Sequence, residues 1–349
     1  MVARGERENA TGQGRLVRPP MDPAHGVRKF KLSPHELVDA VTAAEDLFVL
    51  AHLGVPRVNP VCWTFSIDGL VERERSFTLD ELKARPKKVV EAVHHCCGSP
   101  LEPNVPTRRA ANVRWGGVDL AALLDELGID PNARFLWSYG LDGGEFADKS
   151  CEWFLKDLPL ERLAAGDVLL AHELNGVPLP AEHGFPVRLV VPGYYGTNSV
   201  KWLWKLHLAS HRADGLFTTE FYNDELGEED RAAGLPAQRP VWAIAPESII
   251  VSPQSGTAVA LGQPIEIHGW AWSFRSVATV EISVDGGESF TRATLEERRG
   301  WGWQRFSLIW QPSVRGEAQL CARASETSGT AQPRDGARNA MHFLAVLVR

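Results

Sequence analysis

The sequence predicts an α+β protein in which a mixed α/β domain is followed by an all-β sandwich. Three observations support this prediction. The 349 residues are more than one domain usually contains. Up to about residue 208, stretches with the two-residue period of strands alternate with short stretches of helical spacing. Beyond a segment rich in alanine, glycine and proline at 232–240, only short strands remain, with turn signals at roughly ten-residue spacing. We therefore expect a flexible tail at 1–32, a first domain at 33–235 and a second domain at 241–349.

The first ordered element is expected to be a helix that begins at Ser33. Ser33 suits the N-cap, Pro34 suits the first helical position, and Glu36 can close a capping box. Apolar residues follow at helical spacing, namely Leu37, Val41 and Ala44.

The rest of the first domain is expected to mix strands with short helices. Residues 63–71 (WTFSIDGLV) predict a strand, a turn at Asp68 and Gly69, and a second strand. Residues 78–82 (TLDEL) contain a capping box, and 118–128 is the clearest helix. The N-cap, apolar face and end of that helix are Asp119, then Leu120, Leu123, Leu124 and Leu127, then Gly128. Two later stretches predict buried strands, 185–193 (FPVRLVVPG) and 200–208 (VKWLWKLHL).

The second domain is expected to consist of strands alone. Val280, Ile282 and Val284 alternate toward one face, and Asp285 with Gly286 predicts a hairpin turn. The strand candidates are 264–273 (PIEIHGWAWS), 278–287 (ATVEISVDGG), 290–295 (FTRATL) and 317–325 (EAQLCARAS).

Half of the 12 tryptophans fall in the second domain. They are Trp242, Trp270, Trp272, Trp301, Trp303 and Trp310. Two interpretations stay open: the indoles fill the core of the sandwich, or some of them pack against another subunit.

Composition excludes several classes of protein. The chain is 44% hydrophobic and 23% charged, which is typical of globular domains. Its net charge of -7 argues against a nucleic-acid-binding surface over the whole protein. No apolar run approaches the roughly 20 residues that cross a bilayer. The tail at 1–32 lacks the apolar centre of a signal peptide, so we expect a cytoplasmic protein, or a periplasmic one if a signal peptide has been removed.

The five cysteines are too few and too scattered for a disulfide framework. No C-x-x-C-H motif for covalent haem occurs, and neither haem nor flavin is evident in the sequence.

Residues 89–100 (VVEAVHHCCGSP) bring two histidines and two cysteines to a turn. A zinc site is disfavoured, because consecutive residues of an extended segment point to opposite faces. Two interpretations remain: buried side chains without a role, or one thiolate that binds a thiol-preferring metal.

The chain resembles the sulfite oxidase family of molybdenum enzymes. Cys96-Cys97-Gly98-Ser99 matches, with two changes, the Cys-Ala-Gly-Asn turn that supplies the protein ligand to molybdenum in this family. The resemblance covers about residues 46–345, with blocks in the same order and spacing. The other blocks are 67–82 (IDGLVERERSFTLDEL), Trp115 with Gly117 and Leu120, Gly140 to Asp142, 170–203 (LAHELNGVPLPAEHGFPVRLVVPGYYGTNSVKWL), 269–273 (GWAWS) and 280–290 (VEISVDGGESF).

The resemblance implies a sulfite-oxidase-type molybdopterin-binding domain, an immunoglobulin-like dimerisation domain, and a homodimer. It implies that Cys96 binds molybdenum and that Arg188 and Lys201 contact the phosphate of the pterin, where charge-assisted hydrogen bonds are strong. The residues implied to line the pterin are His52, Asp142, His183, Arg188, Ser199 and Lys201.

The sequence departs from the family where sulfite is bound. Leu50 replaces an arginine upstream of His52, and 98–101 lacks the arginine pair that follows the metal cysteine. The tyrosine of the family active site is also missing from 209–217. Candidate replacements for the arginines are Arg108, Arg109 and Arg114. A substrate with less charge than sulfite suits these changes better.

The resemblance implies oxygen-atom transfer to a small sulfur compound. An external electron acceptor, a cytochrome or dioxygen, is then needed, because the chain shows no second redox centre. Two alternatives stay open: a molybdenum-dependent reductase of an S-oxide or N-oxide, and a non-catalytic dimeric scaffold that retained the fold.

Overall fold

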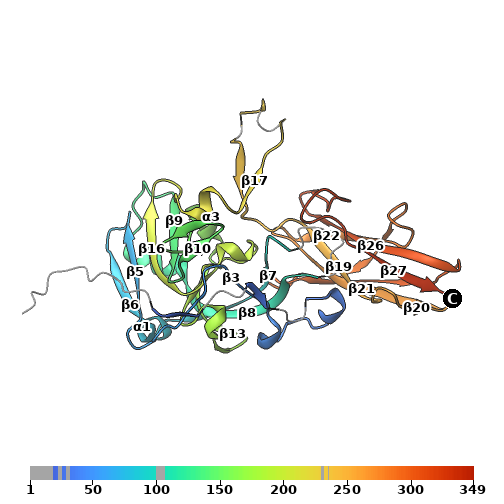
Figure 1. Cartoon of the computed structure of the whole chain (residues 1–349), viewed down its shortest axis with the longest axis horizontal. Coiled ribbons are helices and arrows are strands. Elements are labelled where there is room, and N and C mark those ends of the chain that lie inside the picture. Colours follow the sequence, from blue (N-terminus) through green and yellow to red (C-terminus); the bar gives the residue numbers. More distant parts are fainter. Residues whose placement is uncertain (1–18, 23–25, 29–31, 100–106, 229–231, 235) are drawn as a thin grey trace, which may run out of the picture.

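The computed structural model describes residues 19–22, 26–28, 32–99, 107–228, 232–234 and 236–349. Within these ranges the chain forms two bodies of sheet that lie next to each other along the long axis of the molecule (Figure 1). A hairpin projects from the region between them (Figure 1). No helix in the described ranges is long and apolar enough to cross a bilayer.

Two five-stranded sheets form the first domain. One has the order β12-β9-β16-β5-β6, in which only the pairing of β16 with β5 is parallel. The other has the order β14-β13-β8-β7, and β15 also pairs with β13. The first sheet contains β5 (Thr64–Gly69), β6 (Arg75–Thr78), β9 (Phe135–Gly140), β12 (Leu155–Pro159) and β16 (Leu203–Ala209). The second contains β7 (Lys87–His95), β8 (Ala110–Asp119), β13 (Leu169–Leu174), β14 (Val177–Pro178) and β15 (Arg188–Val190).

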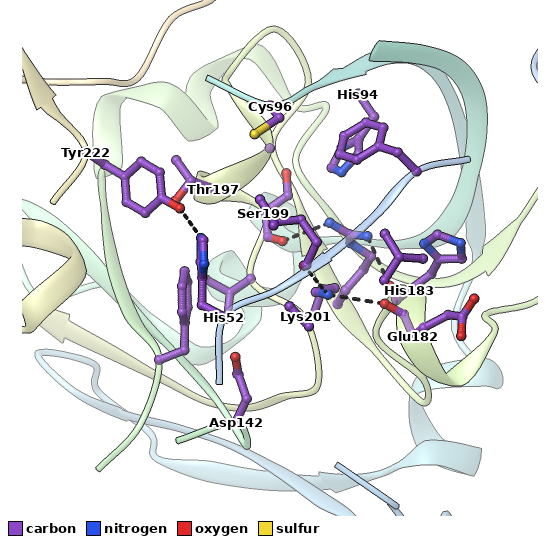
Figure 2. A pocket seen from close by; sticks show the side chains of 18 residues that line it. His52, His94, Cys96, Asp142, Glu182, His183, Thr197, Ser199, Lys201 and Tyr222 are labelled. Atoms are coloured by element: carbon purple, nitrogen blue, oxygen red, sulfur yellow. Dashed lines mark hydrogen bonds between the residues drawn. The ribbon is translucent and has the colours of Figure 1, made fainter. Parts of the chain in front are cut away.

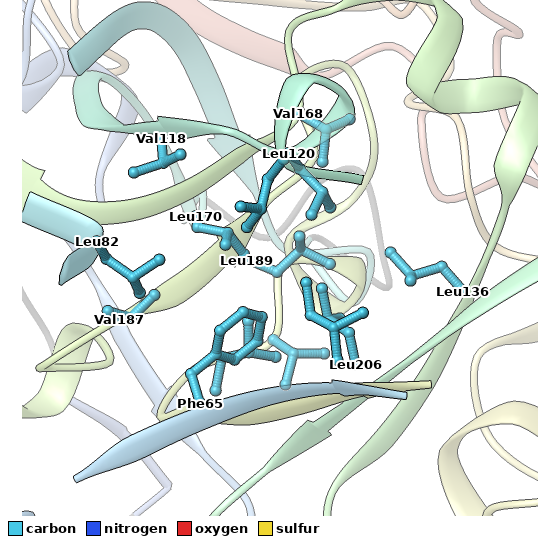
Figure 3. Close-up of a cluster of buried hydrophobic side chains, with 14 of the residues drawn as sticks. Phe65, Leu82, Val118, Leu120, Leu136, Val168, Leu170, Val187, Leu189 and Leu206 are labelled. Atoms are coloured by element: carbon cyan, nitrogen blue, oxygen red, sulfur yellow. The ribbon is translucent and has the colours of Figure 1, made fainter. Parts of the chain in front are cut away.

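The core of the first domain lies between these sheets and under helix α2 (Leu120–Leu127) (Figure 3). As predicted, Asp119 caps α2 through its carboxylate, and Gly128 ends the helix with a φ of +77°. The predicted capping box of helix α1 (Leu79–Lys83) is also present. Side chains from both sheets and from α2 meet in the core, among them Phe65, Leu120, Leu170, Leu189 and Leu206.

Short elements complete the first domain. The paired strands are β1 (Met21–Asp22) with β4 (Val55–Pro56), β2 (Gly26–Arg28) with β3 (Val49–Ala51), and β10 (Gly144–Phe146) with β11 (Lys149–Cys151). The helical turns are η1 (Pro34–Glu36), η2 (Ala44–Asp46), η3 (Leu160–Ala165), η4 (Ala181–His183), η5 (Gly196–Asn198) and α3 (Leu216–Thr219).

Two predictions for the first domain are wrong in part. The capping box at Ser33 exists, but the helix ends after the single turn η1. Leu37 instead lies in contact with the second domain, because its carbonyl accepts a hydrogen bond from the Trp270 indole (2.5 Å). The turn predicted at Asp68 and Gly69 lies further along the sequence, because these two residues still belong to β5 and pair with β16.

The second domain is the predicted all-β sandwich. Its sheets have the orders β19-β21-β25-β24 and β20-β27-β26-β22-β23, and their apolar faces form one core. The predicted hairpin between β22 and β23 is present, although its loop is longer than a tight turn. The strands are β19 (Glu247–Ser252), β20 (Ala258–Val259), β21 (Ile265–Trp272), β22 (Val277–Ser283), β23 (Thr291–Arg292), β24 (Thr294–Leu295), β25 (Gln304–Trp310), β26 (Gly316–Glu326) and β27 (Phe343–Val348).

Several tryptophans of the second domain pack against the first domain. Trp270, Trp272 and Trp303 share one buried cluster with Val93 and Cys97. The backbone of Trp301 pairs with the free edge of β7, through hydrogen bonds to Glu91 and Val93 (2.9 and 3.0 Å). These indoles therefore join the two domains of one chain, an arrangement that neither sequence interpretation included.

The predicted boundary segment 232–240 belongs to the projecting hairpin (Figure 1). In this hairpin β17 (Asn223–Glu225) pairs with β18 (Gln238–Pro240). The hairpin is joined to the second domain by an ion pair between Asp224 and Arg338.

Candidate active site

One cavity of the first domain brings together all seven residues that the sequence analysis proposed for the site (Figure 2). It encloses about 690 Å³ of space outside the protein atoms, counting the solvent at its mouth. The seven residues come from six separate segments, and they are His52, Cys96, Asp142, His183, Arg188, Ser199 and Lys201.

Cys96 is the first residue after β7, in a turn that the backbone closes. Its own N–H donates to the Arg109 carbonyl (2.9 Å), and its carbonyl accepts from the N–H of Ser99 (3.1 Å). Only 8% of Cys96 is exposed, and its sulfur faces the cavity (Figure 2). The thiol is therefore held at a fixed place on the cavity wall.

The four consecutive histidines and cysteines point alternately to two sides. His94 and Cys96 line the cavity, and the His94 ring stacks on Phe48 at 5.5 Å. His95 and Cys97 lie instead in the contact with the second domain. In the described part of the chain, no three His, Cys, Asp or Glu side chains gather as metal ligands, so the zinc interpretation fails.

The thiols of Cys96 and Cys97 are hydrogen-bonded to each other. The bond from Cys97 lowers the pKa of Cys96 to about 7, against the effect of burial. The same bond and burial raise the pKa of Cys97. Cys96 is thus the thiol that ionises more easily. Cys97 does not line the cavity, as expected for consecutive residues of an extended segment.

Arg188 is a buried cation whose known contacts are all neutral. Its guanidinium donates to the carbonyls of His183 (3.0 Å) and Ser199 (2.9 Å) and lies 4.7 Å from the centre of the Trp115 ring. Within the described part of the chain, its Nε is buried without a hydrogen-bond partner. Burial lowers the pKa of Arg188 to about 9, as expected for a charge that lacks a counterion.

Lys201 adds a second buried cation, an ammonium group, to the same cavity. Its Nζ donates to the carbonyls of Leu50 (2.9 Å) and Glu182 (3.2 Å). Burial, and then the charge of Arg188, lower its pKa to about 7. Burial and these two cations also lower the pKa of His183 to about 3, so His183 is neutral. The site therefore favours an anion.

Ser199 and Asp142 lie beside the two cations. The Ser199 hydroxyl accepts a hydrogen bond from the Val191 N–H (3.0 Å), so it is already engaged by the backbone. Asp142 is 5% exposed, and its charge raises the pKa of Lys201 against the larger effect of burial.

Tyr222 supplies the hydroxyl group that the sequence analysis did not find. Its oxygen lies 2.5 Å from Nε2 of His52, and both side chains line the cavity (Figure 2). Burial, and then Lys201 and Arg109, lower the pKa of His52 to about 4, so its ring is neutral, and the ring tautomer sets which of the two groups donates the hydrogen bond. Tyr222 lies only five residues beyond the segment 209–217 that lacked a tyrosine.

Of the three arginines proposed as replacements, only Arg109 lies next to the cysteine turn. Its guanidinium donates to the Gly98 carbonyl. Arg108 is fully buried against Glu247, and Arg114 is exposed and paired with Glu91. A cation of the second domain, Arg338, also lowers the pKa of Cys96, after the Cys97 bond and the charge of Arg109. Leu101 lies outside the described residues.

The cavity fits a metal-carrying cofactor with an anionic group. One easily ionised thiol suits a thiol-preferring metal, and two buried cations suit a phosphate. The orphaned Nε of Arg188 is a donor that such a phosphate would satisfy.

The chain is similar to molybdopterin-dependent oxidoreductases over both domains. Residues 52–217 match the family described as the oxidoreductase molybdopterin binding domain, and residues 238–347 match the Mo-co oxidoreductase dimerisation domain. Chicken (Gallus gallus) sulfite oxidase is 30% identical over 326 residues, covering 84% of this chain and 68% of the chicken protein. Mitochondrial sulfite oxidase of Drosophila melanogaster is 28% identical and is covered over only 55% of its length. The chain thus spans between half and about two thirds of these relatives.

Among solved structures, the sulfane dehydrogenase SoxCD from Paracoccus pantotrophus is similar over nearly the whole chain. The TM-score is 0.77 at 26% identity, with 98% of this chain and 93% of that chain covered. This similarity confirms the predicted combination of a mixed α/β domain with a C-terminal β sandwich.

Proposed function

Because this chain belongs to the sulfite oxidase family of molybdopterin-dependent oxidoreductases, we propose that it transfers an oxygen atom to a small reduced sulfur compound. Relatives named sulfite oxidase and a neighbour named sulfane dehydrogenase support a sulfur substrate. The observation that carries the proposal is the single cavity that combines the Cys96 thiol with the buried cations Arg188 and Lys201.

The proposed site residues have distinct tasks in holding the cofactor. Cys96 binds the molybdenum through its thiolate. Arg188 and Lys201 bind the phosphate of molybdopterin, and the phosphate also satisfies the free Nε of Arg188. The remaining contacts to the pterin come from side chains on the same cavity wall, namely His52, Asp142, His183 and Ser199.

When bound, molybdopterin supplies a metal centre that exchanges an oxygen atom and two electrons with the substrate. Tyr222 is aimed into the cavity by its hydrogen bond to His52, and the pair holds one proton between them. When Nε2 of His52 carries the ring proton and donates to the phenol oxygen, the Tyr222 O–H is free to donate to an oxygen-bearing or sulfur-bearing group of the substrate. Arg109 adds positive potential beside Cys96.

The substrate need not be sulfite. The Leu50 side chain lines the cavity at the position where the family resemblance places an arginine, which removes one cation from an anion site. An apolar side chain there favours a substrate with less charge or with an organic group.

Steady-state assays test the proposal directly. We expect the purified protein to oxidise at least one of sulfite, thiosulfate and dimethyl sulfide with ferricyanide as the acceptor, and the Tyr222→Phe variant to be slower by about ten- to a hundredfold. Reduction of dimethyl sulfoxide by reduced methyl viologen, with no oxidation, would favour the reductase. No turnover in either direction by molybdenum-loaded protein would favour the scaffold.

The physiological partners follow from the same chemistry. Two electrons must leave the site, so we propose an external acceptor such as a cytochrome. The match of residues 238–347 to a dimerisation domain supports a homodimer.

A further inference from the structure

The cysteine turn receives a hydrogen-bond chain from the second domain. Trp272 lies at the end of β21 and donates its indole N–H to Nδ1 of His95 (3.4 Å). Nε2 of His95 is 2.8 Å from the carbonyl oxygen of Ser99. His95 directly precedes Cys96, and Ser99 closes the turn that Cys96 opens.

The chemistry of the two partners determines the proton position on His95. An indole N–H can only donate, and a carbonyl oxygen can only accept. Nδ1 of His95 must therefore carry the lone pair, and Nε2 must carry the proton. His95 is then a neutral bridge with one fixed tautomer, and both of its nitrogens are used.

The cysteine turn is tied to Ser99 by further hydrogen bonds, so Ser99 and Cys96 can only move together. The Ser99 N–H donates to the Cys96 carbonyl (3.1 Å), and the Ser99 hydroxyl accepts from the backbone of Arg109. All three residues of the hydrogen-bond chain are buried, with exposed fractions of 1% for His95, 3% for Ser99 and 2% for Trp272. Water therefore does not readily replace a hydrogen bond that is lost here. A shift of the Ser99 carbonyl therefore moves the Cys96 sulfur.

We infer that Trp272 and His95 are positioning residues for the Cys96 thiol. The domain that matches a dimerisation family thus also orients the side chain proposed to bind the metal. This inference rests on the proposed function, in which Cys96 is the ligand.

The domain contact offers a matched control. Trp303 is also a buried tryptophan of the second domain that donates one hydrogen bond to the first, but its acceptor is the carbonyl of Ala40 (3.0 Å). A Trp→Phe change at either position removes one indole N–H from the same contact. Both changes keep an aromatic ring in the buried cluster that includes Cys97, but only the change at Trp272 breaks a hydrogen-bond chain to the cysteine turn.

The test compares Trp272→Phe with Trp303→Phe in the full chain. We expect similar losses of thermal stability in both variants, since each loses one buried hydrogen bond. In protein purified without cofactor, only Trp272→Phe should change the iodoacetamide alkylation rate of Cys96, by about two- to tenfold. In loaded protein, only this variant should alter the electron paramagnetic resonance spectrum of the half-reduced molybdenum.

Equal alkylation rates and equal spectra in the two variants would overturn the inference, because the indole bond would then only stabilise the fold. A changed alkylation rate in Trp272→Phe, together with wild-type protein that binds no molybdenum, would support the positioning role and contradict the proposed function instead. His95→Phe, which loses the bond to Ser99 as well, should change the alkylation rate at least as much as Trp272→Phe.

Discussion

Arg188 and Lys201 place two buried cations in one cavity, where they donate hydrogen bonds to backbone carbonyls. Burying charge is costly unless a counterion or a full set of hydrogen bonds compensates it. The lowered pKa of each side chain shows this cost. A bound anion would remove it, so we expect these two residues to dominate cofactor retention.

Arg188→Met should purify with much less cofactor than the wild type. A charge-assisted hydrogen bond contributes about 1.5–3 kcal/mol, which corresponds to roughly ten- to a hundredfold weaker binding. The measurement is pterin fluorescence after oxidative release, per mole of chain. Arg114→Met is the matched control, because Arg114 is exposed and paired with Glu91 on the surface. Equal pterin in both variants would show that Arg188 does not hold the cofactor.

Anion binding to the cofactor-free chain should weaken as the pH rises. Burial first, and then Arg188, lower the pKa of Lys201 from 10.5 to about 7, so above pH 7 the folded chain loses the proton that an anion needs. In the unfolded chain Lys201 keeps this proton until about pH 10.5. The free energy of unfolding of the cofactor-free chain therefore increases as the pH rises from about 7 to about 10.5. Sulfate, which does not titrate here, should bind on the order of tenfold more tightly at about pH 6.5 than at about pH 8.5.

Calorimetry on two lysine variants checks the assignment. Lys201→Met should abolish the pH dependence of sulfate binding. Lys205→Met should preserve it, because Lys205 pairs with Asp68 on a partly exposed face of the sheet. A pH dependence that survives in Lys201→Met would assign the titration to another group.

Among individual residues, the sequence predicted those cavity residues that lie in segments resembling the sulfite oxidase family. The resemblance to the sulfite oxidase family identified His183, Arg188, Ser199 and Lys201, which fall within the block 170–203. Tyr222, Arg109 and Arg338 were not placed, because they reach the site over loops and from the second domain. Contacts of that kind depend on tertiary packing, which has no local signature in the sequence.

Among the secondary-structure elements, the turn η4 ends close to the two residues proposed to bind the phosphate, Arg188 and Lys201. Gly184 ends η4 with a φ of +109°. A Cβ atom there would lie 3.0 Å from Cβ of Arg188 and 3.1 Å from Cβ of Lys201. Glycine is therefore needed both for the backbone conformation and because Arg188 and Lys201 pack closely against position 184.

Gly184→Ala should destabilise the fold and also reduce cofactor content. The backbone conformation alone costs about 1–2 kcal/mol for a non-glycine residue. Gly176→Ala separates the two effects, because Gly176 has a φ of +85° but no atom within 4 Å of the added Cβ. We expect similar losses in urea denaturation for both variants, and a loss of pterin only for Gly184→Ala. Normal pterin content in Gly184→Ala would show that Arg188 and Lys201 accommodate the added Cβ without weakening cofactor binding.

The elements also show where local patterns succeed. Helices α1 and α2 were predicted with their caps, because capping is decided by a few neighbouring residues. The helix predicted from Ser33 fails after one turn, because its next residues bind the second domain instead, with the Leu37 carbonyl accepting from Trp270. Tertiary contacts overrode a weak local preference there.

For the whole molecule, the two domains share a buried contact that lies next to the cysteine turn of the first domain. Trp301 extends the sheet that carries Cys96, and Trp272 reaches the cysteine turn. The sequence predicted both domains and the sandwich but placed the tryptophans only in a core or a subunit contact. Composition cannot distinguish a core from a domain interface, because both bury aromatic side chains.

The chain should be a homodimer at micromolar concentration. Size-exclusion chromatography with light scattering should give twice the chain mass of 38.5 kDa. The match of residues 238–347 to a dimerisation domain supports this expectation. A stable mass of one chain over a tenfold dilution series would contradict it.

X-ray absorption at the molybdenum edge can determine whether Cys96 binds the metal, since it counts the sulfur atoms bound to molybdenum. Wild-type protein, Cys96→Ser and Cys62→Ser should be compared, the last as a control because Cys62 is exposed and remote from the cavity lining. We expect one fewer sulfur ligand in Cys96→Ser alone, with turnover lost. The same sulfur count in all three proteins would contradict the assignment of Cys96 as the metal ligand.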